Sequence, residues 1–110
     1  MNKIENIIKY LCKNYPHKNE LSKARLTKLV YLADWFSALT KNKQMTNIEW
    51  VFNHYGPYVH DVFEVANNSF YFDIENTKNY YGDNKSIIVY NGPIVQLNKN
   101  GEFIRYWDSQ

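Results

Sequence analysis

The sequence predicts an α+β fold, a mostly helical small domain with a central buried helix and a small antiparallel β-sheet or hairpin. Two observations support this class. Apolar residues recur every three to four positions over residues 2–40, which is the period of amphipathic helices. After residue 48 they alternate with polar residues in short runs, which is the period of strands. The length of 110 residues fits one domain, and we expect residues 1–110 to share a single core.

The first predicted helix covers residues 2–14. Its apolar residues form one stripe along the helix: Ile4, Ile7, Ile8, Leu11 and Cys12. Because Cys12 falls on this stripe, we predict a small buried core residue rather than a nucleophile. Pro16 and the polar run 17–20 then predict a loop.

A second helix is predicted from Ser22, a favourable N-cap residue, to about Thr40. Only Lys23, Thr27 and Asp34 form a continuous polar strip along it. A helix this apolar is normally packed on several sides, so we expect it at the centre of the fold. Its apolar residues are Leu26, Leu29, Val30, Tyr31, Leu32, Ala33, Trp35, Phe36 and Leu39.

After the second helix, short strands and turns are expected around one further helix. Ile48, Trp50 and Phe52 alternate with polar or smaller neighbours and predict a short strand. Gly56 breaks that strand, and Pro57 suits the first position of a third helix ending near residue 67.

The last forty residues are predicted to be mostly β-structure. An alternating run covers 70–74, and a turn-rich connection covers 76–85. Two further β-type runs, 86–90 and 94–97, flank the turn signal Asn91-Gly92-Pro93 and could pair as a hairpin. A fourth helix is expected over 98–107.

Charge and composition restrict the class of function. The formal net charge is +2, and the scattered Lys and Arg residues form no basic stripe, which disfavours nucleic acid as the main partner. A single cysteine excludes an intramolecular disulfide. No segment is typical of a signal peptide or a membrane span, so we expect a cytoplasmic protein without a membrane partner. Ten Tyr residues suit both core edges and interfaces.

Two linked stretches resemble the Panacea (SocA-like) antitoxin domain. The first, residues 26–34, reads Leu-Thr-Lys-Leu-Val-Tyr-Leu-Ala-Asp and is similar to the family's L-x-K-L-L-Y-x-A-[D/Q] helix. The second, residues 50–59, reads Trp-Val-Phe-Asn-His-Tyr-Gly-Pro-Tyr-Val and is similar to its W-x(n)-Y-G-P-V strand-to-helix turn. Their order and spacing agree with the family, and the match is close over roughly the first seventy residues.

The resemblance implies an antitoxin-type protein-binding module that neutralises a cognate toxin by direct interaction. It implies a toxin encoded next to it as the partner and, in one lineage, a protease to which the toxin is delivered. Family members usually continue with a further C-terminal helical segment, which nothing in residues 1–110 resembles. No additional DNA-binding segment is recognisable either, which makes autoregulation by this chain alone doubtful.

Candidate residues divide into partner contacts and structural positions. Tyr and Trp dominate binding hot spots, and Lys28 lies inside the apolar arc of the second helix, where it could snorkel, pair with a carboxylate or contact a partner. The candidates for partner contact are Lys28, Trp35, Tyr55, Tyr58, His60, Tyr80 and Tyr81. The positions expected to serve the structure are Leu29, Tyr31, Asp34, Trp50, Gly56 and Pro57, with Asp34 bonded to a loop or to backbone groups.

Catalysis and cofactor binding have little support. His54, His60 and Asp61 lack the convergent spacing of a zinc site, and no phosphate loop or nucleophile elbow occurs. We therefore expect no enzyme, no metal and no cofactor. The alternative from another class is a nucleic-acid-associated regulator of phage or mobile-element origin, in which Lys residues would contact phosphates and Tyr residues would stack on bases.

Overall fold

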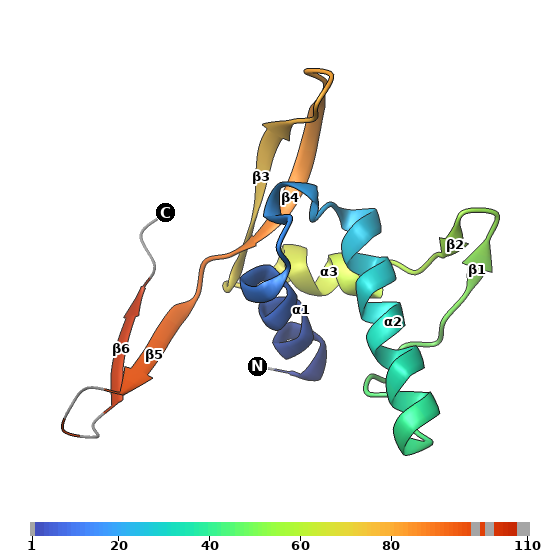
Figure 1. Ribbon diagram of the computed structural model, residues 1–110, viewed down its shortest axis with the longest axis horizontal. Coiled ribbons are helices and arrows are strands. Elements are labelled where there is room, and N and C mark those ends of the chain that lie inside the picture. Colours follow the sequence, from blue (N-terminus) through green and yellow to red (C-terminus); the bar gives the residue numbers. More distant parts are fainter. Residues whose placement is uncertain (1, 98–99, 101–102, 108–110) are drawn as a thin grey trace.

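The computed structural model describes residues 2–97, 100 and 103–107, with side chains described for residues 2–92 and 100. It shows three α-helices and three two-stranded antiparallel hairpins, which confirms the predicted α+β class (Figure 1). The elements are α1 (Lys3–Asn14), η1 (Lys18–Glu20), α2 (Lys23–Lys41), β1 (Phe52–Asn53), β2 (Gly56–Pro57), α3 (Asp61–Asn68), β3 (Phe72–Lys78), β4 (Asn84–Tyr90), β5 (Pro93–Leu97) and β6 (Phe103–Trp107).

Helix α1 forms as predicted. Asn2 caps its first turn, and Asn2 and Glu5 exchange two hydrogen bonds, the Glu5 N–H donating to Asn2 Oδ1 at 2.7 Å. This reciprocal capping box satisfies two backbone donors that a helix start otherwise leaves unpaired. Ile7, Ile8 and Cys12 are buried, and they pack against α2, α3 and β4.

Helix α2 begins where the sequence predicts. The Ser22 hydroxyl accepts a hydrogen bond from the Arg25 N–H at 3.3 Å, and the helix ends at Lys41 with Asn42 in the left-handed conformation that commonly ends helices. Leu26 and Val30 are fully buried in the core that α2 shares with α1, α3 and β4.

The polar strip of α2 is largely buried, and the helix is less enclosed than predicted. Thr27 and Asp34 are 5% and 2% exposed, whereas part of the apolar arc, expected to pack on several sides, faces outward. The loop after α2 folds back and supplies hydrogen-bond donors to Asp34, which makes burial of this carboxylate favourable. In addition, the C-terminal half of α2 extends past α1 and α3, so neither of these helices covers the side of α2 that faces away from the core (Figure 1).

The segment between α2 and α3 also differs from the prediction. The strand predicted from Ile48 to Phe52 forms only at Phe52–Asn53, because the Gln44 amide donates to the carbonyls of Thr46 and Ile48 and holds the preceding residues in a loop. Pro57 does not start a helix. It lies in β2, which pairs with β1, and α3 begins only at Asp61.

Strands β3 and β4 pair over their full lengths, with Phe72 opposite Tyr90 and Lys78 opposite Asn84. The predicted pairing of 86–90 with 94–97 is therefore wrong. The turn at 79–83 closes the hairpin instead, because the Asn79 side chain accepts from two backbone N–H groups and Gly82 supplies a positive φ of 83°. The Ile88 N–H also donates to Leu21 O, which ties β4 to the start of α2.

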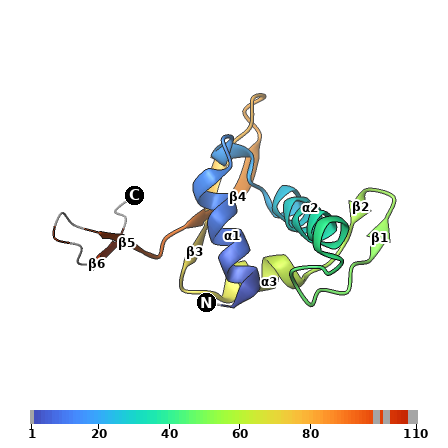
Figure 2. The same cartoon turned by 60° about the horizontal axis from the view of Figure 1, so that its bottom comes forward.

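The predicted fourth helix is wrong over 103–107, where the chain forms β6 and pairs antiparallel with β5. Residues 98–99 and 101–102 lie outside the described part of the chain. Residues 103–107 are rich in aromatic and β-branched side chains, and such residues favour strands when a partner strand is available. The β5–β6 hairpin extends away from the helices (Figures 1 and 2).

Candidate functional site

A groove lies between the N-terminal half of α2 and the β1–β2 hairpin, with the start of β4 at one side. Its volume is about 680 Å³. We call it the α2–hairpin groove. Its lining residues are Ser22, Lys23, Ala24, Arg25, Thr27, Lys28, Asn53, Tyr55, Pro57, Tyr58, Val59, His60, Lys85 and Ser86.

The β1–β2 hairpin forms one wall of the groove because its local sequence specifies a tight turn. The Asn53 side chain accepts a hydrogen bond from the Tyr55 N–H at 2.8 Å, and Gly56 takes a φ of 108° that other residues rarely adopt. The Tyr58 N–H then donates to Val51 O. The turn leaves the Tyr55 side chain 96% exposed at the hairpin tip.

Aromatic contacts fix the hairpin against α2. The Tyr31 ring lies edge-on to Trp50 at 5.3 Å and to Phe52 at 5.1 Å between centroids. Such edge-to-face pairs each contribute about 0.5–1.5 kcal/mol beyond their buried area. Tyr31 thus links α2 to Trp50 and to the first strand of the hairpin.

Asp34 is the structural centre of the loop that precedes the hairpin. Its Oδ1 accepts hydrogen bonds from the Met45 and Thr46 N–H groups, each at 2.9 Å. Its Oδ2 accepts from the Thr46 hydroxyl and from Trp50 Nε1, the latter at 2.8 Å. Four donors on one buried carboxylate hold residues 45–50 against α2.

The charged side chains that line the groove are all cationic: Lys23, Arg25, Lys28 and Lys85, with His60 beside them. Lys23 lies over the Phe63 ring at 4.8 Å, and Arg25 donates to the Tyr15 hydroxyl at 2.9 Å. The side-chain ammonium groups of Lys28 and Lys85 make no hydrogen bond or ion pair to any residue that the structure describes. The groove therefore suits a carboxylate-rich or phosphate-bearing ligand that offers apolar surface to Tyr55 and Tyr58.

The structure brings four of the seven predicted contact residues together. Lys28, Tyr55, Tyr58 and His60 line the groove, and the Tyr58 and His60 rings contact each other at 5.3 Å. Trp35 lies two turns further along α2 than Lys28 and does not line the groove, and Tyr80 and Tyr81 lie in the β3–β4 turn, where they are 96% and 84% exposed. Binding by these seven residues stays a prediction.

Sequence reasoning missed Arg25 and Lys85 as groove residues. Arg25 lies three residues before Lys28 and so on the same side of α2, which the helical period could have revealed. Lys85 could not be found in this way, because it reaches the groove only through the packing of β4 against the start of α2. Leu29 is half-buried against the core, and Gly56 and Pro57 serve the hairpin.

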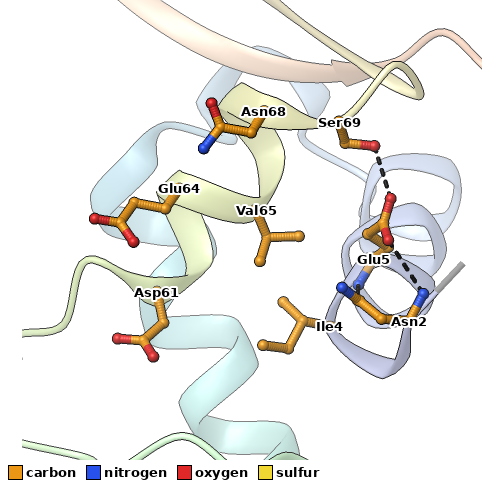
Figure 3. A pocket seen from close by; sticks show the side chains of 8 residues that line it. All are labelled: Asn2, Ile4, Glu5, Asp61, Glu64, Val65, Asn68 and Ser69. Carbon is orange, nitrogen blue, oxygen red and sulfur yellow. Dashed lines mark hydrogen bonds between the residues drawn. The ribbon is translucent and has the colours of Figure 1, made fainter.

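A second hollow, of about 420 Å³, lies between the start of α1 and α3 (Figure 3). Glu5 bridges its walls, accepting from the Asn2 N–H at 3.1 Å and from the Ser69 hydroxyl at 2.8 Å. These bonds to Asn2 and Ser69 stabilise the ionised form and lower the pKa of Glu5. The polar groups of Glu5 are thus used within the fold. The lining residues are Asn2, Ile4, Glu5, Asp61, Glu64, Val65, Asn68 and Ser69.

Cys12 is a core residue, as predicted. It is 6% exposed, and burial raises the pKa of its thiol to about 12. A thiol in this state is a poor nucleophile. Among the residues that the structure describes, no three His, Cys, Asp or Glu side chains are grouped as metal ligands would be, and no helix there is long and apolar enough to cross a membrane.

Comparison with known proteins identifies the family. The sequence model of the Antitoxin SocA-like, Panacea domain family matches residues 26–105, which includes both motif stretches, α2 from Leu26 onward and most of the residues that line the groove. No curated protein and no solved structure is significantly similar to the chain. The match covers most of the sequence, and the chain therefore belongs to the SocA-like antitoxin (Panacea domain) family.

Proposed function

We propose that the chain neutralises a cognate toxin protein by binding it directly. The observation that carries this proposal is the position of the family match, which covers α2 from Leu26 onward and most of the residues that line the groove. Membership of an antitoxin family points to a non-catalytic role, in which the surface itself is the working part. Occlusion of the toxin is the mechanism that such a surface supports most directly.

The groove supports the proposal through its residue types. Tyr55 and Tyr58 offer large, rigid side chains that lose little conformational entropy on binding. Lys28 and Lys85 have no partner among the described residues and can pair with carboxylates of a bound protein. Because hydrogen bonds and aromatic contacts already fix the hairpin, little ordering is needed when a partner binds. Delivery of the bound toxin to a protease would use a surface outside the groove.

The cationic lining of the groove also supports a second candidate, a nucleic-acid-associated regulator. Lys28 and Lys85 would contact phosphates and Tyr55 would stack on a base. This candidate predicts that the affinity for nucleic acid falls steeply as the salt concentration rises, because each neutralised phosphate releases about one counterion. The antitoxin proposal predicts no binding to nucleic acid at physiological salt.

A pull-down with the tagged chain tests both candidates. The chain is purified from its host lysate after nuclease treatment, and co-purifying proteins are identified by mass spectrometry. The antitoxin proposal predicts one protein, encoded next to the chain, that inhibits growth when expressed alone and not when co-expressed with the chain. Loss of all specific partners on nuclease treatment would instead support the regulator.

A further inference from the structure

Helix α2 carries an apolar face on the side opposite the core. We call it the outer face of α2, formed by Leu32, Trp35, Phe36 and Leu39, which are 43%, 50%, 63% and 65% exposed. At 3.6 residues per turn, these positions lie about 180° round the helix from the buried residues Leu26, Val30 and Asp34. The intervals of three and four residues make the four side chains neighbours in one patch.

The patch is too large to be an incidental exposure of single residues. Aromatic side chains present about 150–250 Å² each, and here two of them expose half or more of that surface beside two leucines. Scattered apolar residues are normal on protein surfaces, whereas a contiguous patch of a few hundred Å² is typical of an interaction site. Covering the outer face with an apolar surface of a partner would therefore lower the free energy, because it removes this apolar area from water.

The charges beside the patch restrict what can cover it. Arg25 and Lys28 continue the outer face toward the start of α2, one to two turns before Leu32. The only carboxylate on α2 is Asp34, which is buried with its oxygens bonded to the following loop. The outer face of α2 is thus apolar from Leu32 to Leu39 and cationic at Arg25 and Lys28. Lys28 also lines the α2–hairpin groove, so that the two surfaces are continuous.

We propose that the outer face of α2 binds an amphipathic segment of the toxin, apolar where it covers Phe36 and Leu39 and acidic where it passes Lys28 into the groove. This rests on the proposed function, because it names the part of the toxin that is bound. Apolar burial supplies the affinity, and the carboxylates set the direction in which the segment lies.

A second copy of the chain fits this surface less well. If two outer faces pair parallel, Lys28 faces the same residue of the other copy, and these like charges oppose association. If they pair antiparallel, Arg25 and Lys28 of each copy find no carboxylate on the other outer face, because the only carboxylate on α2 is the buried Asp34.

Two synthetic helical peptides test the proposal without the toxin. Both carry the same apolar face of Leu residues, and one ends in Glu residues where the other ends in Lys residues. Fluorescence anisotropy measures their affinity for the full chain. We expect the Glu peptide to bind at least about tenfold more tightly than the Lys peptide.

Matched variants locate the binding. Phe36→Gln should weaken binding of the Glu peptide by about fivefold or more, whereas Phe70→Gln, at another highly exposed phenylalanine, should change it by less than about twofold. Lys28→Gln should reduce the preference for the Glu peptide, and Lys3→Gln should not. Circular dichroism confirms that the variants stay folded.

Equal affinity for the two peptides, failure of both to bind, or equal effects of Phe36→Gln and Phe70→Gln would overturn the proposal. So would sedimentation equilibrium showing a dimer that Phe36→Gln dissociates, because a second copy would then cover the outer face. The antitoxin function would survive each of these results, since it is tested separately by growth rescue with the toxin.

Discussion

Replacing Asp34 with alanine should destabilise the fold strongly, because it removes the acceptor that holds the loop after α2. The change leaves four hydrogen-bond donors without their partner. Two of them belong to Thr46, which is 4% exposed, while the Met45 N–H and the Trp50 indole can regain water more easily. An unpaired buried donor costs about 1–3 kcal/mol, so the Thr46 pair alone predicts a loss of about 3 kcal/mol in the free energy of unfolding.

Urea unfolding followed by tryptophan fluorescence measures this loss. For a small domain with an m value of about 1.5 kcal/mol/M, a loss of about 3 kcal/mol lowers the midpoint by about 2 M. Thr46→Val removes one of the donors and should cost about half as much. Because both residues share one network, the double variant should lose less than the sum of the two single losses.

Asp83→Ala is the matched control, because Asp83 is exposed and its carboxylate has no hydrogen bond to the described residues. It should change stability by less than about 0.5 kcal/mol. An Asp34→Ala midpoint indistinguishable from that of Asp83→Ala would refute the view that this carboxylate holds the loop and, through it, the hairpin wall of the groove.

Three further outcomes follow from single residues. Cys12 should resist thiol reagents in the folded protein and react once urea unfolds it, since its pKa is raised to about 12; rapid labelling of the native chain would contradict its burial. Gly56→Ala should lower the free energy of unfolding by about 1–2 kcal/mol, because the backbone at this position has a φ of 108°, which strains alanine even though open space surrounds its side chain. An unchanged melting temperature would show that the turn adopts another conformation. The pKa of Glu5 is lowered in the folded state, so its stabilising effect is present above its ordinary pKa of 4.5 and is lost as pH falls through the folded value. Glu5→Gln should therefore be less stable than the wild type at pH 7, and the difference in stability should shrink in acid. A difference that does not change with pH would exclude this linkage.

The helices were predictable because their signals are local. The stripe from Ile4 to Cys12 and the N-cap Ser22 act within a few residues of one another, and the structure confirms both helices. The motif around Asp34 likewise predicted a carboxylate bonded to a loop. The identity of that loop could not be predicted, because the groups that donate hydrogen bonds to Asp34 lie eleven to sixteen residues further along the chain.

The pairing of strands and the direction in which α2 faces depend on tertiary packing. Asn91-Gly92-Pro93 is a stronger turn signal than the sequence around Asn79, yet the hairpin closes at Asn79, where side-chain hydrogen bonds and Gly82 stabilise the turn. The apolar arc of α2 extends almost all round the helix. Helical periodicity therefore could not tell which part packs in the core and which part, including Trp35 and Leu39, remains exposed.

The candidate site was predictable in its residue types and only partly in its assembly. Tyr55, Tyr58 and His60 follow one another closely in the sequence, and the β1–β2 hairpin brings them to one wall of the groove. Lys28 joins them because the hairpin folds back on α2. The contact between Tyr31 and Phe52, which are about twenty residues apart in the sequence, holds the hairpin there. Lys85 comes from a different hairpin altogether.

The most direct test of direct toxin binding is isothermal titration calorimetry between the purified chain and the growth-inhibiting protein recovered with it, both free of nucleic acid. We predict a saturable complex with a Kd of about 1 μM or tighter, which Leu39→Gln weakens and Phe70→Gln leaves unchanged. Absence of any heat of binding at these concentrations, while co-expression still restores growth, would contradict the account, because neutralisation would then not require contact between the two proteins.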